Sequence, residues 1–275
     1  MATLVAKADG TAEPFDPSKL RTSLRRSGAD DDVAEEISKE IETELYNSIT
    51  TSEIYRRAFA HLRDHRHSAA ARYSLKRAIL DFGPSGFPFE AYLAELFRTQ
   101  GYSASIDQIV KGGCVEHEVD VVLKKGDETT YVEAKFHNTA GFKTDLKTTL
   151  YVKARIDDIR AARPNEQVRG LLVTNTKFTS VAMQYALCEG LPLLGWEYPN
   201  EHNLHDQIDE AKLYPITALT TLSKREKMAL LGDRKVLCSA LSHDSDALSR
   251  IGIHGKRADT ILQEVGALCL PKKEL

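Results

Sequence analysis

Alternating apolar and polar residues predict two neighbouring β-strands in the middle of the chain. In "TTYVEAKFHN", residues 129–138, positions 132, 134 and 136 are apolar and share one face of a strand. The opposite face carries Tyr131, Glu133 and Lys135. A second apolar strand, over residues 119–123, comes just before it and is joined to it by "KKGDE". A carboxylate and an ammonium side by side on such a strand need an explanation.

Helical spacing of apolar residues flanks these strands. One helix has its apolar stripe at Phe89, Leu93, Leu96 and Phe97, and it ends at Gly101. The other elements predicted here are helices around 145–162 and 178–188 and strands at 169–175 and 192–198. A sheet flanked by helices, the α/β class, is the economical architecture for this order of elements.

Gly, Pro and Ser residues suggest where the chain divides. "FGPSGFP", at 82–88, is the best linker, and we expect three domains, at 1–84, 85–200 and 201–275. The first domain is predicted to contain two short strands around a turn at 9–10, and then helices at 17–27, 31–45, 52–63 and 69–81. The last domain is predicted to be helical.

One turn of the last domain loosely resembles a helix-hairpin-helix motif. In "IGIHGKRADTIL", at 251–262, a Gly-Ile-His-Gly turn precedes a basic helix start. The motif binds DNA phosphates through the amides of its turn, but short turns with glycine also join helices that bind nothing. Both interpretations stay open.

Composition excludes some classes of protein. The net charge is −3, so no overall basic character points to nucleic acid, although residues 143–163 hold six basic and three acidic residues. That stretch is either a solvated helix face or a binding surface. No apolar run approaches the ~20 residues of a membrane span, and no secretion signal is present. The four cysteines are isolated, so we expect reduced, mostly buried thiols in a cytoplasmic protein.

The predicted hairpin brings together side chains suited to phosphodiester hydrolysis. Asp120 ends one strand and would lie near Glu133 and Lys135 on the next, and Glu90 could point at the same place from its helix. Carboxylates are the ligands that Mg²⁺ prefers, and a lysine beside the metal can orient or deprotonate the attacking water. The alternative is a cross-strand ion pair of Lys135 with Glu133 or Asp120 on a solvated face.

The same residues resemble the core of the PD-(D/E)xK nucleases, over about residues 86–200. "FEAYLAELFRTQGY", Asp120 and Glu133–Ala134–Lys135 are similar to the branch with Mrr-like restriction endonucleases and archaeal Holliday-junction resolvases. The resemblance implies a mixed sheet flanked by helices. It also implies that Asp120, Glu133 and the carbonyl of Ala134 hold Mg²⁺ (Mn²⁺ is also plausible), that Lys135 serves the water and that Glu90 assists.

Some neighbouring residues have no assigned role. Val119 stands where the nuclease core has proline, which is a tolerated variation, and Lys147 and Tyr151 share a helix face with Arg155 where Mrr-like proteins often place a glutamine. Three further side chains are either ordinary residues at the edge of the site or contacts to metal or phosphate: His117, Glu118 and His137.

The N-terminal segment resembles the ATP-cone domain, which regulates ribonucleotide reductases. The match covers about residues 3–83 and includes "VAKADG", "EPFDPSKL" and "TSEIY" in the family's order. The resemblance implies that ATP or dATP is bound by Val5, Lys7, Glu13, Lys19 and Thr51. Ala8 replaces an arginine that the family usually has, so the alternative is a cone kept for dimerisation or docking without nucleotide. No glycine-rich Walker loop is present.

Together these features predict a Mg²⁺-dependent DNA endonuclease regulated by adenine nucleotide. Because cutting both strands usually takes two sites, we expect a homodimer or a higher homo-oligomer. One alternative is a nucleotide-responsive DNA-binding regulator with an inactive nuclease core, and another is an assembly protein without either activity. The complete set of Asp120, Glu133 and Lys135 favours the enzyme.

Overall fold

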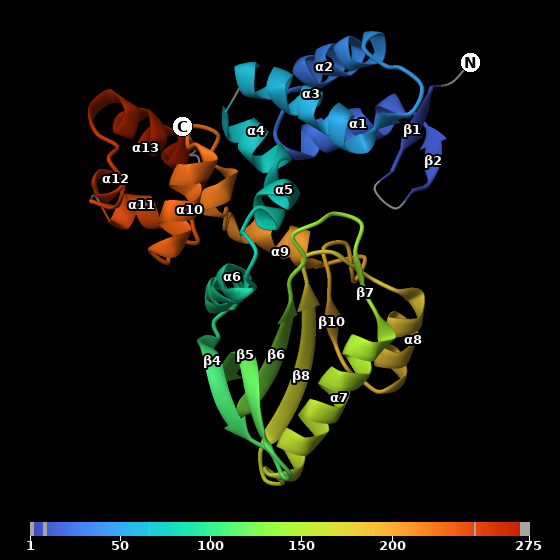
Figure 1. Cartoon of the computed structure of the whole chain (residues 1–275), viewed down its shortest axis with the longest axis vertical. Coiled ribbons are helices and arrows are strands. Elements are labelled where there is room, and N and C mark those ends of the chain that lie inside the picture. The colour runs from blue at the N-terminus through green and yellow to red at the C-terminus, as the bar shows by residue number, and fades with distance from the viewer. Residues whose placement is uncertain (1–2, 8–9, 66, 245, 270–275) are drawn as a thin grey trace. The chain divides into compact units, whose positions relative to one another are not determined.

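The computed structural model describes residues 3–7, 10–65, 67–244 and 246–269. The chain forms two compact units, one of Met1–Ala78 with Tyr214–Leu275 and one of Ile79–Leu213 (Figure 1). No helix of the described residues is long and apolar enough to cross a membrane. The division into three domains at 84 and 200 remains a proposal.

The N-terminal part of the first unit combines a three-stranded sheet with helices. β1 (Leu4–Ala6) pairs antiparallel with β2 (Ala12–Pro14) and parallel with β3 (Ile49–Thr50), so Val5 lies opposite Glu13. The helices are α1 (Pro17–Arg26), α2 (Asp31–Thr43), α3 (Thr51–His65), α4 (His67–Tyr73) and α5 (Leu75–Leu80). Their apolar stripes enclose one core that includes Leu24, Ile37, Ile41, Ala58 and Leu62.

Two details of this part concern the predictions. The helix expected at 69–81 is divided into α4 and α5 at Ser74, whose hydroxyl donates to the carbonyl of Ala71 at 2.9 Å. Serine bonds of this kind compete with the helical ladder. Ala8 and Asp9, which belong to the predicted turn, lie outside the described residues.

The C-terminal part of this unit is helical, as expected. It contains a 3₁₀ turn (Ile216–Ala218), α10 (Lys224–Gly232), α11 (Ala240–His243), α12 (Ala247–Arg250) and α13 (Gly255–Cys269). The expectation of reduced, mostly buried thiols is wrong. Cys238 and Cys269, 31 residues apart, form a disulfide, and Cys114 and Cys188 are exposed.

Hydrogen bonds join the two parts of this unit. The hydroxyl of Thr217 donates to the carbonyl of Ala78 at 2.6 Å. Glu264 on α13 is 5% exposed and accepts from the backbone and hydroxyl of both Thr220 and Thr221. The hydroxyl of Thr220 donates its hydrogen to Glu264. Its oxygen therefore accepts a hydrogen bond from Nδ1 of His67 on α4, at 2.6 Å.

The second unit is built on a five-stranded mixed sheet in the order β10-β8-β6-β5-β4 (Figure 1). β4, β5 and β6 are antiparallel neighbours, whereas β6, β8 and β10 run parallel. The strands are β4 (Ser103–Lys111), β5 (Glu116–Lys125), β6 (Glu128–Lys135), β8 (Gln167–Thr174) and β10 (Leu193–Leu194). The helices are α6 (Phe87–Thr99), α7 (Leu146–Ala161), α8 (Ser180–Cys188) and α9 (Leu204–Ala211), and a small pair is formed by β7 (Lys143–Thr144) and β9 (Lys177–Phe178).

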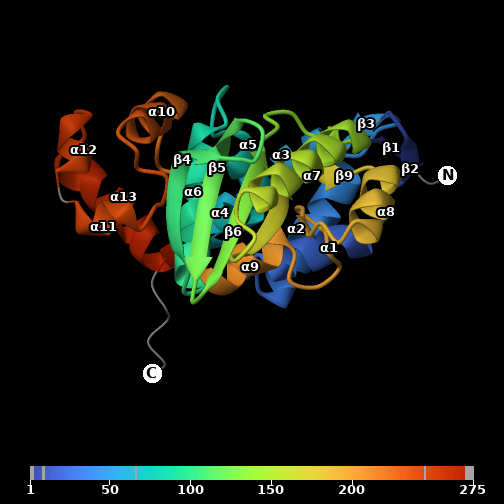
Figure 2. The ribbon, with the colours of Figure 1, turned by 90° about the horizontal axis from the view of Figure 1, so that it is seen from below.

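Helices cover both faces of this sheet, which confirms the α/β class with a mixed sheet (Figure 2). On one face, Tyr131 of β6 packs in a cluster with Val152 and Ile156 of α7. On the opposite face, Phe136 packs against Phe89 of α6 with tilted rings, whose centroids are 5.7 Å apart. A helix therefore packs on each of the two faces predicted for residues 129–138, although Lys135 at the end of β6 is exposed.

The strand β4 was not predicted. It is an edge strand, and its pattern of half-buried and exposed residues gives little apolar alternation. The final strand, expected at 192–198, pairs only over the two residues of β10. Both differences come from the sheet edges, where few side chains are buried and the sequence pattern is weak.

Candidate active site and nucleotide pocket

Asp120 lies where the regular pairing of β5 is interrupted. The β4–β5 ladder skips the pair Asp107–Asp120, and Asp107 has a left-handed φ of 54°. Val119 and Val122, which alternation would place on opposite faces, belong to one core cluster. Distortions of this kind are frequent beside active sites. Asp120 is held in place by the backbone N–H of Ala134, which donates to its Oδ2 at 2.6 Å.

Glu133 forms an ion pair with Arg155 of α7. The guanidinium donates through Nη1 to Oε2 of Glu133 and through Nη2 to the hydroxyl of Tyr151, the latter at 2.6 Å. The side chains of Arg155 and Glu133 are only 11% and 15% exposed. Oε1 of Glu133 accepts no hydrogen bond from the described residues, and Nε of Arg155 is buried without a partner there.

Lys135 lies at the end of β6 and is exposed. Within the described residues it makes no ion pair with Asp120 or Glu133, so the alternative of a cross-strand pair with this lysine is not what the structure contains. The ion pair on this face is made instead by Arg155, a residue whose role the sequence left open.

Burial and mutual charge disfavour the ionised acids of this site. Burial raises the pKa of Asp120, and burial together with the charge of Asp120 raises the pKa of Glu133. Glu90, in the first turn of α6, has its pKa raised to about 7 by burial and then by Asp120 and Asp107. Asp107 lies on the unpredicted strand β4, so sequence reasoning missed it.

The donor set fits a magnesium ion. Two carboxylates on neighbouring strands, each with a raised pKa, offer oxygen ligands whose charge a divalent cation would neutralise. No group of three or more His, Cys, Asp or Glu side chains in the described residues could hold a metal. Mg²⁺ commonly uses only one or two protein carboxylates and keeps several waters, so two are sufficient.

The neighbouring histidines have structural partners. Nε2 of His117 lies 2.8 Å from Asp158 of α7, whose pKa it lowers to about 2. The backbone N–H of His137 donates to Asn175 at 2.9 Å, and burial followed by the charge of Lys135 lowers the pKa of its imidazole. Glu118 is exposed. These contacts favour the interpretation of His117 as an ordinary residue at the edge of the site.

Most of the basic residues at 143–163 are neutralised locally. Lys153, Arg155, Arg160 and Arg163 all pair with acids. The exceptions are Lys143 and Lys147, which are exposed and make no ion pair within the described part of the chain. Lys135, Lys143 and Lys147 are thus exposed cations near the end of β6 and the start of α7 that form no ion pair with any described residue.

The first unit contains a cavity of ≈ 190 Å³ between its small sheet and its helices. Four of the residues predicted to bind nucleotide line it: Val5, Glu13, Lys19 and Thr51. Tyr55 and Tyr73 line it as well, stacked with ring centroids 5.1 Å apart and planes 7° apart. Ligand pockets are usually larger, at about 300 Å³ or more. This cavity therefore has room for only part of a nucleotide.

Two lysines meet at one acid beside this cavity. Lys7 and Lys19 lie 2.6 and 3.2 Å from Glu13, and their hydrogen bonds lower the pKa of its carboxyl. Lys7 does not line the cavity itself, but reaches it through Glu13. Asp16 lines the cavity as well, so the two lysines are matched by two acids.

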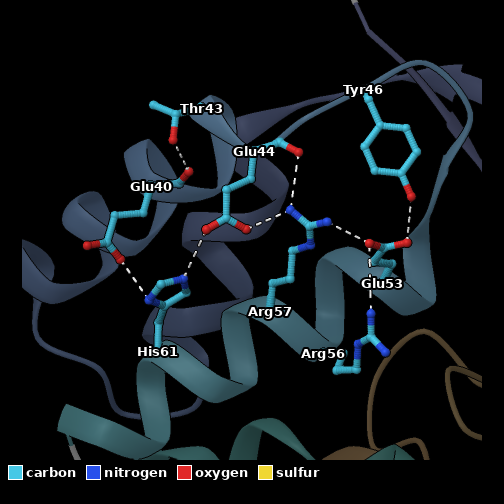
Figure 3. A network of polar contacts seen from close by, with 8 residues as sticks. All are labelled: Glu40, Thr43, Glu44, Tyr46, Glu53, Arg56, Arg57 and His61. Atoms are coloured by element: carbon cyan, nitrogen blue, oxygen red, sulfur yellow. Dashed lines mark hydrogen bonds and ion pairs between the residues drawn. The ribbon is translucent and has the colours of Figure 1, made fainter.

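A polar network fixes the segment that leads to this cavity (Figure 3). Arg57 of α3 donates to Glu44 at 2.7 Å and to Glu53 at 2.6 Å, and the hydroxyl of Tyr46 donates to Glu53 at 2.7 Å. The network therefore joins the end of α2 to α3, whose first residue is Thr51. It holds the start of α3 in position against the cavity.

Known domain families match almost the whole chain. The ATP cone domain matches residues 3–81, the restriction endonuclease family of Mrr type matches 84–194, and the AF1548-like C-terminal family matches 214–269. An uncharacterised protein of Archaeoglobus fulgidus is 34% identical over 173 residues, which are 62% of this chain and 97% of that protein. The chain belongs to the AF1548-like family.

Solved structures agree with this membership. The crystal structure of AF1548, a protein of unknown function, is 32% identical and superimposes with a TM-score of 0.56, over 66% of this chain and 96% of that one. A repair endonuclease from Pyrococcus abyssi is 22% identical over 40% of this chain and 46% of its own, with a TM-score of 0.32 that is too low to support an inference. This family member thus carries an ATP cone and a restriction-endonuclease-like domain.

Proposed function

We propose that this protein is a Mg²⁺-dependent DNA endonuclease. The observation that carries the proposal is the pair Asp120 and Glu133, two acids with raised pKa values on neighbouring strands of a restriction-endonuclease-like domain. Such a pair is unstable by itself and is neutralised by a divalent cation.

Each residue of the site has a role in this proposal. Asp120, Glu133 and the carbonyl of Ala134 hold the metal, which when bound neutralises the scissile phosphate and lowers the pKa of the attacking water. Lys135 orients that water or takes its proton, and its exposure leaves it accessible to substrate. Glu90, whose pKa of about 7 suits proton exchange near neutral pH, assists.

The three exposed lysines support DNA as the substrate. Lys135, Lys143 and Lys147 are exposed and make no ion pair within the described residues, so their ammonium groups are accessible to phosphates. Contacts of this kind position a nucleic acid without selecting its sequence. We further propose that the enzyme acts as a homodimer or a higher homo-oligomer, because cutting both strands takes two sites.

We also propose that adenine nucleotide regulates the enzyme through the cone. The cavity beside Glu13 is bordered by two lysines suited to phosphates and by two tyrosines suited to a base. ATP or dATP that binds there should raise the melting temperature of the protein. Absence of a melting shift with either nucleotide would favour a cone kept for docking alone.

The Arg155–Glu133 ion pair favours a second candidate, a DNA-binding regulator with an inactive nuclease core. Arg155 donates to one oxygen of Glu133, and its guanidinium, which is always charged, can take the place of a metal ion there. The two candidates differ in one respect that can be measured. The regulator binds DNA without cutting it, and its Lys135→Ala variant behaves like the wild type.

Nicking of supercoiled plasmid tests the endonuclease directly. We expect cleavage with Mg²⁺ or Mn²⁺, none with a chelator, and a loss of roughly 10²-fold or more in Lys135→Ala. Lys124→Ala, at an exposed lysine of β5, is the matched control and should cut like the wild type. No metal-dependent nicking, or equal nicking by Lys135→Ala, would contradict the proposal.

A further inference from the structure

Two large aromatic side chains are exposed beside the candidate active site. Phe142 is 58% exposed and Tyr151 is 57% exposed. Large aromatic residues normally bury their rings, because burial of their apolar area is strongly favourable. Their exposure at this place is therefore a feature that the fold does not require.

Both rings contact residues that lie next to the proposed catalytic groups. The ring of Phe142 stacks on His137, two residues beyond Lys135, with centroids 5.6 Å apart and planes 11° apart. The guanidinium of Arg155 lies 4.7 Å from the ring centre of Tyr151 and also binds Glu133. Each ring thus contacts one neighbouring side chain and still has a large exposed area.

Three exposed lysines lie near the two rings. Lys143 follows Phe142 directly, Lys147 lies one helical turn before Tyr151, and Lys135 lies two residues before His137, on which Phe142 stacks. A surface with exposed lysines between exposed rings favours an anionic partner that also offers flat apolar faces. It matches a strand that has phosphates on one side and unstacked bases on the other.

We infer that Phe142 and Tyr151 are stacking platforms for unpaired bases, and that the DNA substrate has a single-stranded segment at the cleavage site. The inference rests on the proposed function, whose substrate it specifies. In an intact duplex the bases are stacked on one another and offer no free face to a side chain. A bulge, flap or single strand does offer such faces, and stacking on an aromatic side chain then adds affinity.

Binding to matched oligonucleotides tests the inference without any cleavage. The affinity of the full-length protein is measured by fluorescence anisotropy with Ca²⁺ in place of Mg²⁺. The probes share one sequence and are a complete duplex, a duplex with a short bulge, the same bulge made of abasic sites, and a single strand. We expect the bulge and the single strand to bind more tightly than the duplex, and the abasic bulge, which keeps the phosphates, to lose that advantage.

Variants assign the preference to the rings. Phe142→Ala and Tyr151→Ala should each weaken binding to the bulge by about tenfold and leave duplex binding unchanged. Phe142→Trp and Tyr151→Phe, which keep a ring, should retain the preference. Val181→Ala, at a 52% exposed apolar residue of α8, is the control for loss of surface area and should change neither affinity.

Several outcomes would overturn the inference. These are equal affinity of the wild type for duplex and bulge, equal losses on both probes in the alanine variants, or a change in oligomeric state on size-exclusion chromatography in place of a change in DNA binding. Failure of the proposed function is distinguishable from these. A protein with the ring-dependent preference that cuts no DNA contradicts the catalytic role alone, whereas one that nicks plasmid without the preference contradicts the stacking role alone.

Discussion

The pKa values of the acids are shifted in opposite directions in the two candidate sites. Beside the cone cavity, hydrogen bonds from Lys7 and Lys19 lower the pKa of Glu13, so its ionised form is stabilised. In the nuclease-like domain, burial raises the pKa values of Asp120 and Glu133, so their ionised forms are destabilised. Glu13 is exposed and has two lysines beside it, whereas Asp120 and Glu133 are mostly buried, with Arg155 paired to Glu133.

The difference indicates the charge of the ligand that each site takes. Neighbouring lysines favour an anion such as a nucleotide phosphate, and buried acids whose ionised forms are destabilised favour a metal cation. The direction of a resident acid's pKa shift is therefore informative where a count of charged residues is not. In this chain the net charge of −3 says little about either site.

Neutralising Asp120 should produce the largest effect. Asp120→Asn keeps an oxygen that accepts from the N–H of Ala134 but removes the charge proposed to hold the metal. We expect plasmid nicking to fall by about 10²–10⁴-fold. Without metal, the same variant should melt at a higher temperature than the wild type, because the charge that raises the pKa of Glu133 is gone.

Glu116→Gln, at an exposed acid on the same strand, controls for a simple change of net charge and should alter neither quantity. A variant that loses activity and also melts at a lower temperature would show that Asp120 is needed for folding, and the contrast between the two sites would fail.

Breaking the Glu133–Arg155 pair should have the next largest effect. Arg155→Met leaves Glu133 without its cation in a site that is mostly buried, and we expect a loss on the order of 3 kcal/mol in the free energy of unfolding without metal. Mg²⁺ should recover more of this stability in the variant than in the wild type, since the competing cation is gone. Urea denaturation with and without Mg²⁺ measures both effects.

Arg160→Met removes an exposed arginine from the same helix and serves as the control. If Mg²⁺ stabilises Arg155→Met no more than it stabilises the wild type, Arg155 is not a competitor for the metal position.

Glu90 should make stability depend on pH. Its folded pKa of about 7 lies above the ordinary value of 4.5, so the folded state has no penalty below pH 4.5, loses stability as the pH rises from 4.5 to about 7, and loses no more above that. Glu90→Gln should remove that loss, which is about 1–2 kcal/mol once solvent screening of the half-exposed carboxyl is allowed for. Thermal melts without metal at pH 5 and pH 8 measure it, because Glu90 of the folded protein is mostly protonated at the first pH and mostly ionised at the second. A variant that gains equally at both would show that the carboxyl's titration is not the cause.

The smallest effect is expected in the cone, where the residue to be replaced is a cation. Lys19→Met removes one exposed cation beside Glu13 and should reduce the ATP-induced rise in melting temperature by an amount equivalent to less than about 1 kcal/mol. Lys39→Met, at an exposed lysine of α2, is the control and should leave the shift unchanged. Equal shifts in the two variants would remove Lys19 from the nucleotide site.

The parts of the fold that sequence predicted are those with strong periodic patterns. The apolar stripe of α6 and the alternation of β6 are buried as expected, because each element packs on a large core. The edge strand β4 was missed, and with it Asp107, because a strand with one covered side has little apolar signal. The pairing of Cys238 with Cys269 joins elements far apart in sequence, which no local pattern reveals.

The candidate site was predicted in type and incompletely in geometry. A strand with Glu133 and Lys135 indicates chemistry, but the partner of Glu133 depends on how α7 is rotated against the sheet. That rotation is set by the packing of residues such as Val152 and Ile156 in the core. Arg155 could therefore be placed on a helix face from sequence, but its contact could not be predicted.

The hydrogen bond from Thr217 to the carbonyl of Ala78 indicates how the chain could be shortened. It places the points where the chain leaves and re-enters the first unit beside each other, with Ile79–Leu213 between them. The nuclease-like unit is thus an insertion, so a short peptide could replace it and join residue 78 to residue 214. The product would keep the ATP cone and the C-terminal helices and lack the restriction-endonuclease-like domain, so that the proposed nucleotide binding could be measured on the first unit alone.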